Sequence, residues 1–205
     1  MDKARENILR KLQAAVQQQP ATTVATTINR AAIFGKEPLD LSQFFEQQFV
    51  QLGGKLHSGT TNATLPLEVA TLIESNKWEG VLCYEEALQS IVATASRLPT
   101  DSNEKALEAT VSITSCQALI ARTGSILVDS NTLSGRRLSI VSPIHIVVAY
   151  RHQLVVDMAA AFAQYQTPLP SMLCLISGNS KTADIEKTLV NGAHGPKELH
   201  LFLLD

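Results

Sequence analysis

Cysteine is scarce and scattered in this 205-residue chain. The three cysteines are Cys83, Cys116 and Cys174, and no two of them form a CxxC pair. An odd and dispersed set argues against a disulfide framework, and against a zinc or iron–sulfur site built from this chain alone. We therefore expect no metal site and no bound cofactor. Each cysteine is interpreted as a small buried apolar residue.

Long apolar runs and an excess of either charge are also missing. The longest apolar stretches, such as Ile144–Tyr150, fall far short of the roughly 20 residues that a membrane-spanning helix needs. Lys and Arg number 17 against 19 Asp and Glu, with no polybasic run, so the electrostatic footprint of nucleic-acid binding is absent. The first 16 residues mix charges with apolar side chains, unlike a secretory signal. These features predict a cytoplasmic protein without a membrane span or a nucleic-acid partner.

Strands and helices alternate through much of the chain, which is long enough for one well-buried core. In the first half, helical spacing predicts helices over Leu41–Leu52, Pro66–Ser75 and Glu85–Ser96, with strands at Lys55–His57 and Gly80–Tyr84. Alternation of this kind is typical of a mainly parallel sheet covered by helices. The prediction is a single α/β domain over residues 1–205, with an open, mainly parallel mixed sheet flanked by helices.

The second half begins with closely spaced apolar segments joined by polar turns. Strands are predicted at Glu108–Thr114, Ser125–Val128 and Leu138–Val141, with a short helix at Cys116–Ala121. This spacing indicates an antiparallel or mixed insertion beside the parallel sheet. The alternation then returns, with strands at His145–Ala149, Met172–Ile176 and Leu199–Leu204 and helices at Leu154–Tyr165 and Thr182–Val190.

An amphipathic helix precedes this domain. Residues 3–16 place Ile8, Leu9, Leu12 and Val16 at helical spacing. The helix either folds back on its own domain or forms an arm, residues 1–20, that docks on a partner subunit. An oligomer is compatible with the second alternative.

The segment Ser177–Thr182 (SGNSKT) is the first candidate ligand site. Chain order places it after a strand and before the predicted helix, where unpaired N–H groups and the helix dipole favour an anion. Gly178 lets the backbone approach a ligand closely, and Ser177, Ser180 and Thr182 offer hydroxyls. The alternative is that Asn179 or Ser180 only caps the helix.

Residues after this loop extend the candidate site. Asp184 and Glu186 lie in the first turns of the predicted helix, where compensation of the helix dipole also explains them. His194 stands beside Gly195 in the loop that follows. It either meets a ligand or partner or has no functional role.

Two more polar turns are candidates. Thr123, Gly124 and Ser125 form a turn before a strand, where they either surround a ligand with hydroxyls or only reverse the chain. His145 heads a strongly apolar strand and either faces a pocket or is a core residue. No Ser/His/Asp elbow, HExxH motif or GxGxxG fingerprint is present, so the catalytic residues stay unassigned.

Five segments occur in a fixed order: ARTGS at 121–125, GRR at 135–137, PIHIVV at 143–148, SGNSKTADIE at 177–186 and VNGAHGP at 190–196. This ordered set resembles the LUD domain, the family of lactate-utilization protein C. The resemblance is strongest over residues 108–205. Two positions depart from the family pattern: Asn179 replaces a proline, and Arg122 replaces an acidic residue. An arginine there favours an anionic ligand.

The resemblance implies a fold similar to the sugar-phosphate isomerase and CoA-transferase superfamily. It implies a subunit that takes part in the oxidation of L-lactate to pyruvate, together with partner proteins that carry the iron–sulfur clusters. The alternatives are a stand-alone enzyme of the isomerase or acyl-CoA-transfer kind, for which Asp184 and Glu186 are the only nearby carboxylates, and a non-catalytic assembly module.

Overall fold

The computed structural model describes residues 3–18, 38–94, 109–132, 137–183, 189–191 and 195–205. The chain divides into two units, residues 1–37 and residues 38–205. The first unit contains helix α1, Lys3–Gln18, in agreement with the helix predicted for the arm. Ile8, Leu9 and Leu12 on this helix are all exposed. No helix among the described residues is long and apolar enough to cross a membrane.

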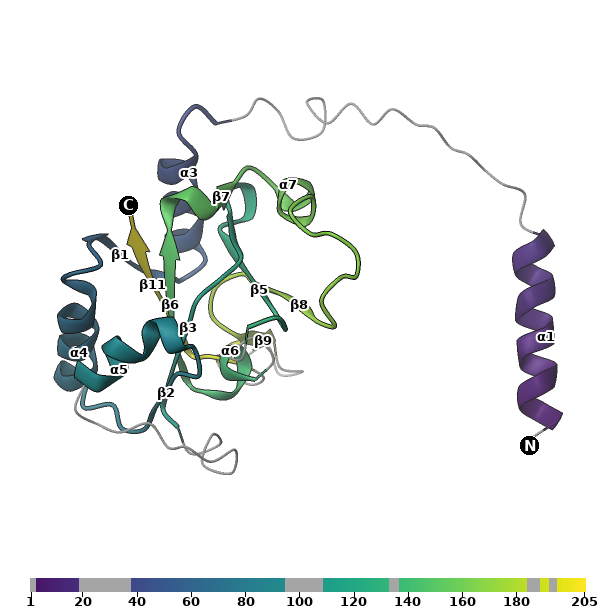
Figure 1. Ribbon diagram of the computed structural model, residues 1–205, viewed down its shortest axis with the longest axis horizontal. Helices are drawn as coiled ribbons and strands as arrows, with labels where there is room; N and C mark the ends of the chain where they lie inside the picture. Colours follow the sequence, from purple (N-terminus) through teal and green to yellow (C-terminus); the bar gives the residue numbers. More distant parts are fainter. Residues whose placement is uncertain (1–2, 19–37, 95–108, 133–136, 184–188, 192–194) are drawn as a thin grey trace. The chain divides into compact units, whose positions relative to one another are not determined.

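A five-stranded parallel sheet forms the centre of the larger unit (Figure 1). Its strands, in the order β1-β11-β6-β3-β2, are Lys55–Thr60, Glu198–Leu204, Ile144–Tyr150, Val111–Thr114 and Val81–Leu82. All four pairings are parallel. The central strands β6 and β11 are apolar at almost every position, because both faces of a covered parallel sheet are buried. The predicted fold class is thereby confirmed.

Helices cover one face of the sheet. Alternate residues of β6 (Ile144, Ile146 and Val148) pack with α4, Leu65–Ser75, and with the short helical stretch Glu86–Leu88 and α5, Gln89–Thr94. In α4 the apolar side chains that face the sheet recur at helical spacing: Leu65, Val69, Ala70 and Ile73 are buried. In Figure 1, α4 and α5 are drawn to the lower left of β6.

A helix and a second sheet cover the opposite face. Val147 and Ala149 of β6 pack with Phe45 and Phe49 of α3, Leu41–Gln51. The second sheet has the order β7-β4-β5-β8, and its strands are Leu154–Val155, Ala118–Ile120, Ser125–Asp129 and Leu173–Ile176. β5 is antiparallel to both β4 and β8, whereas β4 and β7 are parallel. The mixed insertion that the sequence predicted is therefore a separate layer.

Three local predictions between residues 116 and 165 were wrong. Cys116–Ala121 was predicted as a helix, but Ala118–Ile120 is strand β4, because pairing with both β5 and β7 outweighs a weak helical preference. Leu138–Val141 was predicted as a strand and is helix α6, with Leu138 buried against Leu82. Short apolar runs fit either structure, so the period alone cannot decide between them.

The third wrong prediction is the helix over Leu154–Tyr165. The structure has strand β7 at its start and a shorter helix, α7, over Met158–Phe162. The side chain of Asp157 accepts a hydrogen bond from Ala160 N at 3.0 Å, so this N-cap fixes where the helix begins.

The helix predicted over Thr182–Val190 is contradicted where the chain is described. Lys181–Ala183 is strand β9 and Leu189–Asn191 is strand β10, and the two pair antiparallel with Val190 opposite Thr182. Cross-strand hydrogen bonds outweigh the helical spacing here, and Thr182 and Val190 are β-branched residues that favour strands. Residues 184–188 lie outside the described residues.

Candidate functional site

The turns at 123–125 and 177–180 meet in the structure. β5 and β8 are antiparallel with Ile126 opposite Ile176, so the start of one strand lies beside the end of the other. The hydroxyl oxygens of Ser125 and Ser177 are 2.7 Å apart, within hydrogen-bond distance. Two segments separated by about 50 residues in the sequence therefore share one place in the fold.

A glycine in each turn packs against the end of α3. Gly124 has a φ of 57° and Gly178 a φ of 78°, in the region that favours glycine. A Cβ on Gly124 would lie 2.6 Å from Gln48 C, and a Cβ on Gly178 would lie 2.4 Å from Leu52 O. Neither turn could approach the helix this closely with a larger residue.

Two further segments join these turns through the backbone. Ser180 N donates to Pro196 O at 2.9 Å, and a Cβ on Gly195 would lie 3.2 Å from that of Ser180. Pro143 O accepts from Lys197 N at 2.7 Å. We call residues 123–125, 143, 177–180 and 195–197 the loop cluster. It gathers pieces of four of the five segments that carried the family resemblance.

The loop cluster lies at the amino ends of the parallel strands. Pro143 directly precedes β6. Pro196 lies two residues before β11, and Leu52, which contacts Gly178, lies three residues before β1. The sequence placed the 177–182 loop at a strand's carboxyl end, and it does follow β8. However, β8 belongs to the second sheet, so the loop is not at the carboxyl edge of the parallel sheet, where open α/β sheets bind ligands. The helix start predicted there is also absent, because β9 follows.

Two buried polar atoms beside these segments lack hydrogen bonds within the described part of the chain. They are the Oδ1 atom of Asn179 and the hydroxyl of Ser142, which adjoins Pro143. Buried polar groups almost always form hydrogen bonds, so a hydrogen-bond partner is expected for each of these two atoms. An amide oxygen can only accept, so a partner for Asn179 Oδ1 must supply an N–H or O–H.

His145 is fully buried in β6. Its Nε2 is 2.9 Å from Thr114 Oγ1, and that hydroxyl donates to Ser115 O at 2.9 Å. Thr114 therefore accepts from His145 Nε2–H, which leaves Nδ1 as an acceptor without a partner among the described residues. Burial lowers the pKa of His145 to about 3, so the ring is neutral. Alternation along β6 turns it to the face that the second sheet covers.

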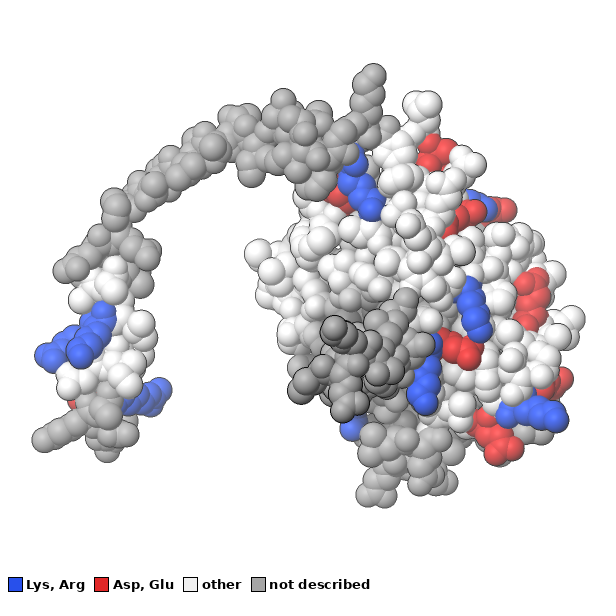
Figure 2. Space-filling model, turned by 180° about the vertical axis from the view of Figure 1, so that it is seen from behind, with Lys and Arg blue, Asp and Glu red and all other residues white. Residues whose placement is uncertain are grey.

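The remaining predicted residues are placed less completely. The backbone of Thr182 lies in β9, whereas nothing is described of its side chain, and Asp184 and His194 lie outside the described residues. Thr123 is exposed, and the neighbouring Arg122 is half-buried. Lys and Arg side chains are interspersed with Asp and Glu on the face of the larger unit drawn in Figure 2.

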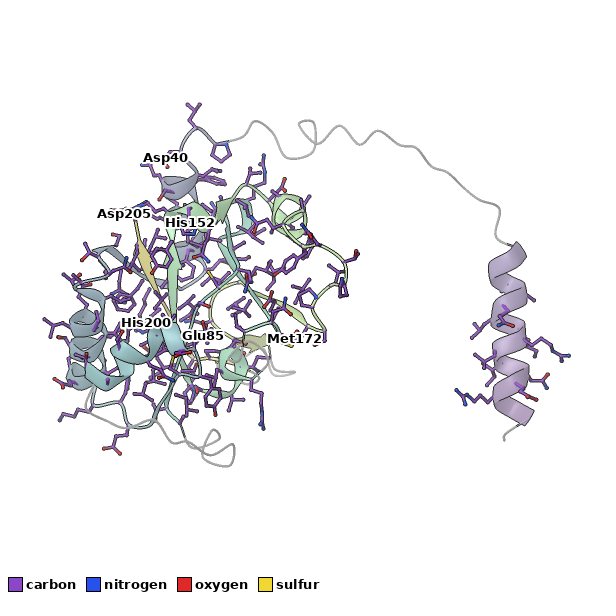
Figure 3. The ribbon with its side chains drawn as sticks, in the orientation of Figure 1. Asp40, Glu85, His152, Met172, His200 and Asp205 are labelled. Carbon is purple, nitrogen blue, oxygen red and sulfur yellow. The ribbon has the colours of Figure 1, made fainter. Side chains whose placement is uncertain are left out.

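The sequence analysis missed a polar group at the carboxyl ends of β6 and β11. Arg151 Nε lies 2.6 Å from the carboxylate of Asp205, and Arg151 Nη1 lies 3.6 Å from Glu46 and contacts Ser42. Asp205 lies at the end of β11, and His152 beside the end of β6, in Figure 3. The residues of this group are far apart in the sequence, so no local motif indicates that they meet.

These features define a class: an α/β protein with a parallel sheet between helices and a second small sheet, and with its characteristic loops at the amino ends of the parallel strands. The profile of the LUD domain matches residues 47–204, most of the chain. The chain therefore belongs to the LUD domain family, and the resemblance seen in the sequence is confirmed.

Individual relatives agree over shorter stretches. The chain is 38% identical over 86 residues to an uncharacterized protein of Neisseria meningitidis, covering 40% of this chain and 37% of that protein. It is 35% identical over 99 residues to a protein of Deinococcus radiodurans named lactate utilization protein C, covering 45% of each. A protein of the same name from Halalkalibacterium halodurans is 33% identical over 99 residues, covering 45% of this chain and 43% of that protein. The matches thus span less than half of these relatives.

A solved structure shares the fold. The crystal structure of a DUF162 family protein from Deinococcus radiodurans superposes with a TM-score of 0.56 at 21% identity, and covers 82% of this chain and 100% of that one. At this identity the likeness concerns the fold, and it agrees with the arrangement of sheets and helices described above.

Proposed function

We propose that this chain acts in lactate utilization, as a cytoplasmic subunit that takes part in the oxidation of L-lactate to pyruvate. Membership of the LUD domain family and the two relatives named lactate utilization protein C support this proposal. The observation that carries it is the loop cluster, because four segments of the family pattern, spread over more than 70 residues, come together there.

The loop cluster is the proposed place for a small anionic ligand. Arg122 precedes Thr123 and Lys197 lies in the cluster itself, so two cationic side chains belong to this part of the fold. L-Lactate also carries a hydroxyl group, which would donate a hydrogen bond to Asn179 Oδ1. A carboxylate with a neighbouring hydroxyl therefore matches the charges and the unsatisfied acceptor.

Oxidation of L-lactate to pyruvate releases two electrons and two protons. In this proposal iron–sulfur clusters of partner proteins receive the electrons, and this chain binds no cofactor of its own. The contribution of the chain is then to hold a ligand and to assemble with those partners.

Growth on lactate tests the role. Deletion of the gene should abolish growth on L-lactate while leaving growth on pyruvate intact, and a tagged chain should recover iron–sulfur proteins from the same cells. Normal growth of the deletion strain on L-lactate would refute the proposal. Recovery of the chain without any iron–sulfur protein would remove the partner assignment.

Asn179→Ala tests the ligand site with a result that a structural role does not give. Asn179→Ala removes a buried oxygen that has no partner among the described residues, so the unfolding free energy should change little. If Asn179 binds a ligand, growth of the complemented strain on L-lactate should nevertheless fall. Asn76→Ala, at an exposed position after α4, is the matched control and should grow normally. Full growth with Asn179→Ala would exclude this residue from the site.

A further inference from the structure

Two histidines without any motif around them are joined in the structure at the edge of the parallel sheet. His57 Nε2 of β1 lies 3.1 Å from His200 Nδ1 of β11, and His200 Nε2 lies 3.3 Å from the carboxylate of Glu198. Lys55 forms an ion pair with Glu198 at 2.7 Å. The result is a continuous chain of contacts from Lys55 to His57.

The direction of these hydrogen bonds follows from the carboxylate. Glu198 can only accept, so His200 Nε2 carries the proton and His200 Nδ1 is an acceptor. His57 must then donate from Nε2, which leaves a lone pair on Nδ1 of His57. Burial lowers the pKa of His57, and lowers that of His200 to about 4, so both rings are neutral at pH 7.

His57 borders a pocket of about 440 Å³ between β1, β11 and α4. The pocket is open to solvent on one side, and its volume would admit a small molecule. The ring of His57 stacks on Phe202 with the centroids 4.3 Å apart, and Leu67 and Leu72 of α4 supply further apolar surface. The pocket lies on the opposite face of the sheet from the second sheet, and none of its residues belongs to the loop cluster.

The polar groups that line this pocket all present acceptors. The hydroxyl of Thr71 donates to Leu67 O at 2.7 Å, and that of Ser75 donates to Leu72 O at 3.1 Å, so their lone pairs remain. Glu68 contributes a carboxylate, and the hydroxyls of Thr60 and Thr64 lower its pKa. His57 lines the same pocket, so the lining combines one negative charge with hydroxyl oxygens and the imidazole ring.

We propose that the pocket between β1 and α4 binds a small organic ammonium ion with an apolar body. A primary ammonium group has three donors and no acceptor, which complements a lining of Glu68, His57, Thr71 and Ser75. The apolar part of the ligand would lie against Phe202 and Leu72. A carboxylate would meet Glu68 with repulsion, and the hydroxyls of Thr71 and Ser75 already donate to backbone carbonyls. This site is separate from the loop cluster and does not depend on the proposed role in lactate utilization.

Titration of the full chain with 2-phenylethylammonium tests the site, in phosphate buffer at pH 7.5 so that no buffer amine competes. Calorimetry should show saturable binding, and amide resonances of α4 and β1 should shift in nuclear magnetic resonance spectra. Phenylacetate, of similar shape but opposite charge, should not bind. An equal affinity for phenylacetate, or no binding of the ammonium ion at millimolar concentration, overturns the proposal.

Variants of α4 locate the binding. Glu68→Gln should raise the dissociation constant about tenfold or more, because a hydrogen bond to a charged group is lost. Glu74→Gln makes the same change in charge at an exposed position of the same helix, outside the pocket, and should leave the affinity unchanged. An equal loss with Glu74→Gln would show a general effect of charge and would overturn the site.

Thr71→Val is a second variant, which keeps the shape of an exposed side chain and removes only the hydroxyl. It should raise the dissociation constant a few-fold, and an unchanged constant counts against the acceptor lining. The nitrogen chemical shifts of His57 provide an independent check, because they distinguish a protonated from an unprotonated ring nitrogen. A proton on Nδ1 of His57 would contradict the assignment.

Discussion

At the scale of single residues, Gly178 and Gly59 form a natural pair. Both have positive φ values, 78° and 80°. A Cβ on Gly178 would lie 2.4 Å from Leu52 O, whereas a Cβ on Gly59 would meet nothing within 4 Å. The two glycines therefore separate the cost of backbone strain from the cost of close packing.

We predict that Gly59→Ala lowers the free energy of unfolding by about 1–2 kcal/mol, the cost of a left-handed conformation. Gly178→Ala should lower it by roughly 1–3 kcal/mol more, because the extra methyl group must displace the end of α3. Urea denaturation of both variants measures the difference. Equal losses would show that the contact between Gly178 and α3 does not constrain this turn.

A second residue-scale prediction concerns pH and His200. Burial lowers the pKa of His200 to about 4, although its contact with Glu198 opposes this. An unfolded histidine titrates near 6.5, so between about pH 6.5 and pH 4 the unfolded chain binds more protons. The stability is complete above this window and falls as the pH decreases through it. One histidine contributes a slope of up to about 1.4 kcal/mol per pH unit.

Denaturation of the unaltered protein and of His200→Gln at pH 7, 6 and 5 measures this slope. The variant should lose less stability between pH 7 and pH 5 than the unaltered protein. His152→Gln, at an exposed position, should keep the original slope. Identical slopes for all three proteins would mean that His200 does not contribute.

At the scale of elements, α3 connects the core with the loop cluster. Phe45 and Phe49 stack on each other with centroids 5.6 Å apart and are fully buried, while the end of the helix lies against Gly124 and Gly178. The helix begins after Asp40, whose side chain accepts from Gln43 N at 3.0 Å. A change in α3 should therefore affect both the stability and the position of these turns.

Phe49→Ala should lower the free energy of unfolding by about 3–5 kcal/mol, because it leaves a large cavity between α3 and the sheet. Val50→Ala, one residue further on the exposed side of the helix, should change it by less than about 0.5 kcal/mol. Thermal and urea unfolding compare the two. A loss below about 1 kcal/mol for Phe49→Ala would mean that α3 is not part of the core.

Asp40→Ala should cost about 1 kcal/mol through loss of the N-cap, whereas Asp40→Asn keeps an acceptor oxygen and should cost much less. The same denaturation measurements separate the two variants. Equal losses would mean that Asp40 acts through its charge and not as a cap.

At the scale of the whole molecule, the chain consists of residues 1–37 and residues 38–205. The apolar side chains Ile8, Leu9 and Leu12 of α1 are 59%, 47% and 57% exposed, so they contribute little to a core of their own. The larger unit contains all three sheets of the described residues and every buried cluster described above.

We predict that deletion of residues 1–37 changes the melting temperature of the remaining chain by less than about 2 °C, because residues of the larger unit form the buried clusters described above. Calorimetry of the full and shortened chains measures this. If the first unit is an arm that docks on a partner, the shortened chain should recover less of that partner. A large drop in melting temperature would instead show that the arm folds back on its own domain.

The sequence alone determined the elements with strong patterns. Helical spacing located α3 and α4, and strongly apolar runs indicated the strands β6 and β11. Both signals arise within one segment, because a side chain's burial repeats with the period of its own element. The order of the polar segments likewise indicated the family.

The tertiary structure decided which of these residues meet. His57 and His200 are 143 residues apart and touch because β1 and β11 pair in parallel, which no local spacing encodes. The loop cluster lies at the amino ends of the parallel strands because β8 joins the second sheet, and β9 pairs with β10 where a helix was expected. Strand pairing depends on contacts between distant segments, so the sequence determined the elements and the three-dimensional fold decided the sites.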